Sequence, residues 1–269
     1  MTSRRPETVL IVIPARLSSR RLPRKMLLAD SGRTLVEHTW LAARLARSAA
    51  AVAVATDSEE IAAAVRGFGG VAVMTSPDCA SGTERIVAAL DRLPAAANVV
   101  NEQGDEPELA GEAIDTAVSL LGRCPEAGVA TLVTPLRCAE DLRDPAAVKA
   151  VLTPWRDGAG QPVVDAWRAV YFSRAPVPAA RDWTEDLIRA VPPLYWQHVG
   201  LYAYRRRVLE AWNSLPGSRL ADVESLEQLR LVEAGIPLAA AAIEHAARGI
   251  DTPRDYAAFV ARCRAAAAG

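Results

Sequence analysis

Short apolar runs rich in β-branched residues alternate with helix-like patterns through the first half of the chain, and this alternation restricts the fold more than any other feature. The runs have the length of buried strands and occupy residues 9–13, 51–56, 71–74, 99–102 and 129–134. Between these runs, apolar residues recur at helical spacing after the capping residues Thr34 and Ser58. The same spacing is present within residues 82–93 and 111–121. Such alternation predicts β-α-β units around a largely parallel sheet.

From about Leu136 the pattern changes to strands separated by long loops. We predict strands at residues 148–152, 166–172, 197–204 and 238–243, and helices at 206–213, at 223–233 and from Pro253 onward. Residues 175–193 contain four prolines and are predicted to form a loop, because proline cannot donate to a central strand. We interpret residues 1–269 as one domain, in which residues 136–205 form a small β-rich subdomain.

Composition excludes several classes of protein. Of the 269 residues, 51% are hydrophobic and 23% charged, which is typical of a globular chain and not of a disordered or fibrous one. The net charge of −1 gives no general attraction to nucleic acid or to a membrane surface. No apolar run approaches the roughly 20 residues of a membrane span, so we expect a cytoplasmic protein. The four cysteines form no CxxC pair, and HExxH and GxSxG motifs are absent, so the chemistry must rest on carboxylates, amides and arginines.

A strongly basic segment follows the first predicted strand. Five cations lie between Arg16 and Lys25, and they repel one another unless an anion lies among them. In an open α/β sheet, ligands bind at the carboxyl ends of the strands. The segment therefore predicts a polyphosphate site, although it matches neither GxxxxGK[ST] nor GxGxxG. The alternative interpretation is a solvated basic loop.

A second polar segment follows the predicted strand at residues 99–102, where Gln103-Gly104-Asp105 forms a glycine turn with a carboxylate. Mg²⁺ takes hard oxygen ligands, commonly one or two carboxylates together with substrate phosphates. Asp105 is the natural candidate ligand. Taken alone, a Gly-Asp pair is more often only a turn, so its weight comes from its pairing with the basic segment.

Together these segments resemble the 3-deoxy-manno-octulosonate (Kdo) cytidylyltransferases, also called CMP-Kdo synthetases. The resemblance covers nearly the whole chain. It rests on the segments 13–16, 22–25, 81–85, 103–107, 171–174, 198–205, 226–230 and 249–253, which read IPAR, LPRK, SGTER, QGDEP, YFSR, HVGLYAYR, LEQLR and GIDTP.

The resemblance implies a three-layer fold like that of the nucleotide-diphospho-sugar transferases, with a mixed sheet flanked by helices. It implies CTP as donor, Mg²⁺ as cofactor, an acidic acceptor and a homodimer. The subdomain at residues 136–205 would then serve acceptor binding and dimerisation. By similarity, the triphosphate is held by Arg16, Arg21 and Lys25, which with Asp105 are the expected catalytic residues. The nucleotide pocket would also be lined by Ser81, Thr83, Arg85 and Gln103. The metal would be held by Asp105 and Asp251. The acceptor would be bound by Arg174, Arg181, His198, Tyr202, Glu227 and Gln228.

Three departures from the family pattern fall on the acceptor side. Ala179 and Ala180 follow Pro178 where the family has an aromatic residue, Gln197 replaces a cation, and Ala221 replaces a glutamate. The donor residues are intact. The acceptor is therefore expected to be a Kdo-like sugar acid or, alternatively, a small phosphonate such as phosphonoformate. A glycosyltransferase-like enzyme and a non-catalytic nucleotide-binding protein are the alternatives of another class.

Overall fold

The computed structural model describes residues 8–244, 246–247 and 249–268, which fall into two compact units. The first unit comprises the described residues up to Asp115 and from Ala247 onward, and the second comprises residues 116–246. Helix α4 (Gly111–Arg123) carries the chain from the first unit into the second. No helix within the described residues is long and apolar enough to span a membrane.

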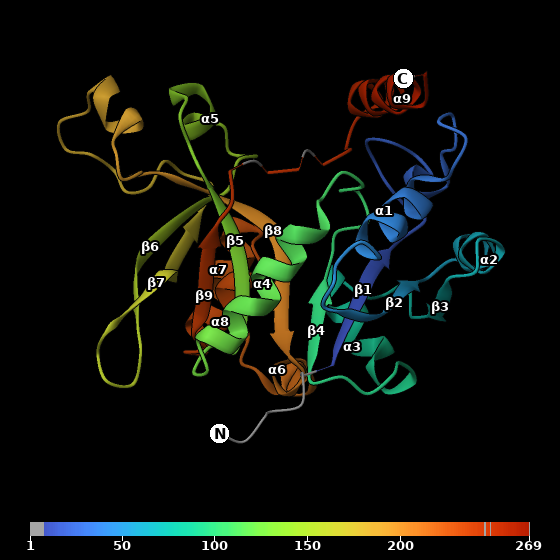
Figure 1. Ribbon diagram of the computed structural model, residues 1–269, viewed down its shortest axis with the longest axis horizontal. Coiled ribbons are helices and arrows are strands. Elements are labelled where there is room, and N and C mark those ends of the chain that lie inside the picture. Colours follow the sequence, from blue (N-terminus) through green and yellow to red (C-terminus); the bar gives the residue numbers. More distant parts are fainter. Residues whose placement is uncertain (1–7, 245, 248, 269) are drawn as a thin grey trace. The chain divides into compact units, whose positions relative to one another are not determined.

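The first unit is built on four parallel strands in the order β3-β2-β1-β4 (Figure 1). These strands are β1 (Val9–Ala15), β2 (Ala49–Thr56), β3 (Val71–Met74) and β4 (Asn98–Asn101). Its helices besides α4 are α1 (Leu35–Ala43), α2 (Glu59–Gly67), α3 (Gly82–Ala89) and α9 (Pro253–Ala268). The central strand β1 is buried along its length, as its continuous apolar run predicts.

Side-chain caps set where the helices of this unit begin. Thr34, Ser58 and Ser81 each accept a hydrogen bond from the backbone N–H three residues later, as expected of N-cap residues. Because the strands are parallel, their carboxyl ends share one edge of the sheet. The polar segments that follow β1, β2 and β4 therefore gather at that edge.

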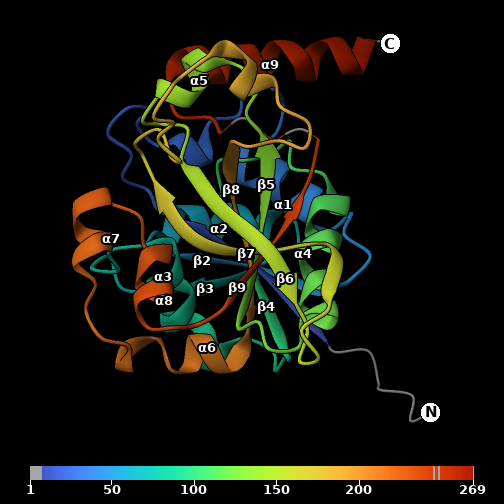
Figure 2. The same ribbon diagram turned by 90° about the vertical axis from the view of Figure 1, so that its left-hand side faces the viewer.

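The second unit has five strands in the order β8-β5-β9-β7-β6 (Figure 2). Strand β5 pairs parallel with β9 and antiparallel with β8, while β7 pairs antiparallel with β9 and β6. The strands are β5 (Val129–Pro135), β6 (Lys149–Arg156), β7 (Pro162–Ser173), β8 (Trp196–Arg205) and β9 (Leu238–Ala242). The short helices are α5 (Ala139–Arg143), α6 (Arg206–Glu210), α7 (Arg219–Glu224) and α8 (Gln228–Glu233).

The expected mixed α/β fold is confirmed. The segment 136–205 supplies β6, β7 and β8, which share a sheet with β5 and β9 from outside that segment. The proline-rich stretch 175–193 is a loop with one 3₁₀ turn, Glu185–Arg189, as predicted.

Two helix predictions in the second unit were wrong in their bounds. The single helix expected at 223–233 is two helices, α7 and α8, because Ser225 adopts φ +51° in the left-handed region and ends α7. The helix expected at 206–213 ends at Glu210 and is followed by a 3₁₀ turn, Trp212–Ser214. Neither break carries a glycine or proline at the point where the helix ends.

Candidate functional site

The edge of the sheet in the first unit carries a large polar cavity of about 1110 Å³. This volume is slightly above the range usual for small-molecule sites. Its walls come from the segments after β1 and β4, the start of α3, and the segment before α9. The lining residues are Pro14, Arg16, Ser18, Ser19, Arg20, Arg21, Lys25, Met26, Cys79, Ala80, Ser81, Gly82, Arg85, Gln103, Gly104, Asp105 and Asp251.

The cavity wall carries five cations and two carboxylates. Within the described residues, the exposed side chains of Arg16 and Arg20 make no ion pair, whereas Arg21, Lys25 and Arg85 each pair with an aspartate. The excess of positive charge favours an anionic ligand. The interpretation of the basic segment as an anion site is thus supported by where it lies.

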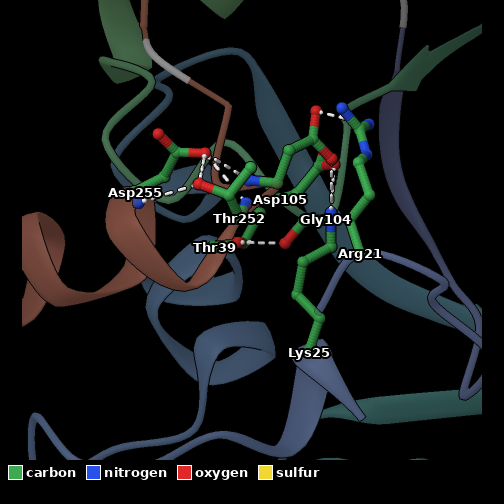
Figure 3. A network of polar contacts seen from close by, with 8 residues as sticks. Arg21, Lys25, Thr39, Gly104, Asp105, Thr252 and Asp255 are labelled. Carbon is green, nitrogen blue, oxygen red and sulfur yellow. Dashed lines mark hydrogen bonds and ion pairs between the residues drawn. The ribbon is translucent and has the colours of Figure 1, made fainter. Parts of the chain in front are cut away.

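Lys25 lies between two carboxylates that are far apart in the sequence (Figure 3). Its Nζ is 2.6 Å from Asp105 Oδ2 and 3.1 Å from Asp251 Oδ1, and its side chain is 10% exposed. Arg21 Nη2 reaches Asp251 Oδ2 at 2.9 Å, although the Arg21 side chain is 66% exposed. Arg24, the residue before Lys25, has φ +55° and points to Glu60 at the surface. The chain therefore turns at Arg24 and directs Lys25 inward.

The meeting of Asp105 and Asp251 has a local cause at each end. The backbone N–H of Ile250 donates to the Asp105 carbonyl at 2.9 Å, which joins the two segments. Thr252 and Asp255 form a reciprocal capping arrangement at the start of α9, in which Asp255 Oδ2 also accepts from the Asp251 N–H (Figure 3). Asp251 is thus held at a helix start.

Thr39 of α1 supports the turn that carries Asp105. Its buried hydroxyl donates to the Gly104 carbonyl at 2.8 Å (Figure 3). Gly104 also packs closely, because a Cβ there would lie 3.0 Å from the Pro14 carbonyl oxygen and 3.1 Å from Met26 Sδ. The turn is therefore fixed by both a hydrogen bond and a close backbone approach.

Replacing Thr39 by valine tests this support. The change keeps the shape but leaves the Gly104 carbonyl without its donor, so we expect a loss of about 1–3 kcal/mol of unfolding free energy. Chemical denaturation measures it. Thr39→Ser, which keeps the hydroxyl, is the matched control, and equal stability of Thr39→Val and wild type would contradict the assigned role.

The other predicted nucleotide residues take two different positions. Ser81 caps α3 and lines the cavity, as do Gln103 and Arg85. Arg85 is nearly buried and donates to Asp57 Oδ2 at 3.1 Å. Thr83 is fully buried beneath the wall, where its Oγ1 accepts from Asn101 Nδ2 at 3.3 Å, and it is absent from the described lining.

Two predicted acceptor residues, His198 and Tyr202, lie together on β8 in the second unit. Their ring centroids are 5.3 Å apart, and His198 also meets Phe172 edge-on at 4.9 Å. His198 Nε2 is 2.9 Å from Thr131 Oγ1. Burial lowers the pKa of His198 to about 3, so the ring is uncharged at neutral pH. It can contact an acceptor only as a neutral group.

The remaining predicted acceptor residues belong to the end of β7, to the loop that follows it and to the start of α8. Arg174 is held by backbone carbonyls: its Nε, Nη1 and Nη2 donate to those of Glu224, Pro145 and Ser225. Glu227 and Gln228 lie at the start of α8, with Gln228 buried. Arg181 is exposed in the loop 175–193. The structure thus brings Arg174 close to the α7–α8 turn and leaves Arg181 at the surface.

The comparisons with known proteins agree with this geometry. The profile of the cytidylyltransferase family matches residues 10–242, which is most of the chain. The chain belongs to the cytidylyltransferase family.

Several members of this family are similar to the chain over nearly their whole length. The 3-deoxy-manno-octulosonate cytidylyltransferase of Rhodopirellula baltica is 45% identical over 254 residues, covering 94% of this chain and 97% of that protein. The 8-amino-3,8-dideoxy-manno-octulosonate cytidylyltransferase of Shewanella sp. (strain ANA-3) is 40% identical over 250 residues, covering 92% and 95%. A solved CMP:2-keto-3-deoxy-manno-octonic acid synthetase complexed with CTP matches with a TM-score of 0.84 at 36% identity, covering 95% of this chain and 98% of that one.

Asp105 and Asp251 fit the Mg²⁺ that the family resemblance implies. The Lys25 ammonium already lies within bonding distance of both carboxylates, so a cation between them is geometrically possible. Burial, together with the charges of Asp105 and Asp251, raises the pKa of Glu106 to about 8. A divalent cation would relieve this crowding of carboxylates. No cluster of three or more His, Cys, Asp or Glu ligands occurs among the described residues.

The buried His198 also makes a pH-dependent contribution to stability in this cytidylyltransferase. Its pKa is about 3 in the folded protein against 6.5 in the unfolded chain, so between these values the unfolded state binds more protons. The contribution is complete above about pH 6.5 and is lost as the pH falls toward 3. Denaturation measures the unfolding free energy at pH 7 and at pH 5. The decrease between these two pH values should be about 2 kcal/mol smaller in His198→Gln than in wild type. Equal losses would contradict a neutral, buried His198.

Sequence reasoning did not assign a role to three residues that the geometry singles out. Arg20 lines the cavity with Arg16, and Asp57 pairs with Arg85. Lys149 of β6 is fully buried, lies opposite Gln197 in the β6–β8 register and donates to the Asp144 carbonyl. A lysine within an apolar strand pattern was the available signal for Lys149. Asp57 comes directly before the N-cap residue Ser58, and nothing in that local pattern indicates its pairing with Arg85.

Proposed function

We propose that the protein transfers CMP from CTP to 3-deoxy-manno-octulosonate or a closely related sugar acid and releases pyrophosphate. The observation that carries the proposal is the cavity of the first unit, which is lined by five cations and by the carboxylates of Asp105 and Asp251. Family membership and the similar proteins named above supply the nucleotide and the acceptor class. The phosphonate alternative has no support among these relatives.

In the proposed reaction, a hydroxyl oxygen of the sugar acid attacks the α-phosphorus of CTP. The bond from that phosphorus to the bridging oxygen of the β-phosphate breaks, pyrophosphate leaves, and the hydroxyl proton passes to solvent. Such a transfer depends on positioning and on neutralising charge more than on a covalent intermediate. Arg16, Arg20 and Arg21 would orient the triphosphate and balance the charge that develops on the leaving pyrophosphate.

Lys25 has a second task in this scheme. It neutralises Asp105 and Asp251 in the structure described here, and it becomes available to the triphosphate when these carboxylates bind another cation. We expect that cation to be Mg²⁺, which when bound supplies further positive charge beside the reacting phosphate. Asp105 and Asp251 are the residues that would hold it.

The donor part of the proposal is tested by pyrophosphate release. Purified protein with Mg²⁺ and 3-deoxy-manno-octulosonate should release pyrophosphate with CTP and at least 100-fold more slowly with ATP or GTP. Mass spectrometry should identify the CMP ester of the acceptor. Equal rates with ATP would reject CTP as the donor, and cleavage of a nucleotide-sugar instead would favour a glycosyltransferase.

The acceptor part is tested with a panel at fixed CTP. 3-Deoxy-manno-octulosonate, its 8-amino-8-deoxy analogue and phosphonoformate should be compared by kcat/KM. At least one sugar acid should reach roughly 10⁴ M⁻¹s⁻¹ or more, as is usual for an enzyme with its own substrate. Turnover of phosphonoformate with both sugar acids inert would reject the sugar-acid acceptor while leaving CMP transfer in place.

We also infer a homodimer and a cytoplasmic location, where CTP is supplied. Support for the dimer comes from apolar side chains exposed on the segment 136–205: Val164 is 75% exposed, Val191 87% and Leu194 42%. Apolar side chains that remain exposed are the groups that a contact between subunits would bury. Light scattering after gel filtration measures the mass, and a monomer would reject this inference.

A further inference from the structure

Asp57 follows β2 at the same sheet edge as the cavity, and its two carboxylate oxygens hold two different parts of the cavity wall. Oδ1 accepts from the backbone N–H of Leu17 at 3.2 Å, in the basic segment. Oδ2 accepts from Arg85 Nη2 at 3.1 Å, on α3. Asp57 itself is not among the described lining residues. A single carboxylate therefore joins two walls of the cavity from behind.

The Arg85 guanidinium is fixed in orientation by these contacts. Besides Asp57, it donates through Nη1 to Thr75 Oγ1 at 2.7 Å and to the Ser76 carbonyl at 3.2 Å. The side chains of the pair are largely withdrawn from solvent, with Arg85 5% and Asp57 11% exposed. At such low exposure a charged pair is weakly screened and its geometry is tightly held.

Pairing changes what Arg85 can offer a ligand. Its positive charge is balanced by Asp57, so it supplies directed N–H groups more than net charge. Arg16 and Arg20, which make no ion pair within the described residues, keep their charge for an anion. The two kinds of arginine divide the cavity into a charged wall and a wall of fixed donors.

We propose that Asp57 is a positioning residue for nucleotide binding, which sets the start of the basic segment and the Arg85 guanidinium in one geometry. The proposal rests on the proposed function, since the nucleotide is taken to be CTP. It assigns to Asp57 a role beyond its place before the N-cap residue Ser58. It also makes Arg85 effective only while Asp57 is in place.

Three variants separate the two contacts of Asp57. Asp57→Asn keeps an oxygen acceptor for the Leu17 N–H but removes the charge that orients Arg85, so KM for CTP should rise about 10- to 100-fold with a smaller change in kcat. Asp57→Ala removes both contacts and should have a larger effect. In an Arg85→Gln background, adding Asp57→Asn should change KM by less than about threefold, because the partner it orients is already gone.

Glu60→Gln is the matched control. Glu60 contacts Arg24 of the same basic segment, but both side chains are more than half exposed, and neither residue is among the described lining. Its loss should change KM by less than about twofold. The double variant Asp57→Asn/Arg85→Gln removes both charges of the buried pair, so it keeps the test usable if a single variant unfolds.

Binding of CTP, followed by calorimetry without acceptor, separates this proposal from the proposed function. Affinity should fall in the order wild type, Asp57→Asn, Asp57→Ala whether or not the acceptor has been identified. An unchanged affinity in Asp57→Asn, or effects of Asp57→Asn and Arg85→Gln that simply multiply, would overturn the positioning role. Failure of wild type to release pyrophosphate with any acceptor would reject the proposed function, and the order of affinities would still decide the role of Asp57.

Discussion

Replacing Asp105 by asparagine should abolish turnover while leaving the protein folded. Asparagine keeps the shape and an oxygen that can accept from Lys25, and the hydrogen bond from the Ile250 N–H to the backbone carbonyl of residue 105 is unaffected. Lys25 also retains Asp251 at 3.1 Å. The reaction, in contrast, loses a charge at the point where we propose that the metal is held. We expect the rate of pyrophosphate release to fall on the order of 10³-fold or more.

The matched control for Asp105→Asn is Asp78→Asn, because Asp78 belongs to the same unit, is exposed and is absent from the described cavity lining. Its rate should stay within about twofold of wild type. Chelation of divalent ions by EDTA should reproduce the loss in wild type, and excess Mg²⁺ should restore it. An Asp105→Asn enzyme with more than a tenth of wild-type turnover, or a wild-type rate unaffected by EDTA, would contradict the assigned metal role.

The sequence was sufficient for the parts of this fold that depend on local pattern. The strand at 71–74 has the predicted bounds, although Val71 is 55% exposed. Strand β1 differs from its prediction only in extending to Ala15, because its continuous apolar run is buried in the sheet. The α7–α8 break was missed because it depends on the backbone of Ser225, a residue with no strong preference for the left-handed region. Local pattern carries no signal for such a turn.

The candidate site also contains some features that local sequence pattern predicts and others that it does not. The basic segment and Asp105 were recognisable because each follows a buried strand. Asp251 comes after β9 in the chain, and it is placed beside Asp105 by the capping arrangement of α9 and by the Ile250 hydrogen bond to the Asp105 carbonyl. The pairing of Arg85 with Asp57 depends on strand order in space, which no short motif contains. Contacts between distant segments are therefore where sequence reasoning stopped.

Lys25→Met should lower kcat/KM for CTP by about 10²- to 10³-fold, more than Arg21→Ala, for which we expect about tenfold. Methionine has similar length and no charge, so the change removes the ammonium without opening a large cavity. The two expected losses of kcat/KM differ because the two side chains differ in burial. Lys25 is 10% exposed and contacts both carboxylates, whereas Arg21 is 66% exposed and contacts only Asp251. Exposed ion pairs contribute little because solvent screens them.

For the affinity of the protein for a divalent metal ion, we expect Lys25→Met to have no effect or an effect of opposite sign. The Lys25 ammonium pairs with both carboxylates that we propose hold the metal, so without nucleotide it would compete there with a divalent ion. Lys25→Met should therefore bind Mn²⁺, followed by electron paramagnetic resonance, as tightly as wild type or more tightly, even though its turnover collapses. Arg24→Met, which removes a cation that points away to Glu60, should leave both measurements near wild type. Weaker Mn²⁺ binding by Lys25→Met would mean that the lysine organises the carboxylates for the metal instead of competing for them, and the two tasks assigned to Lys25 would then reduce to one.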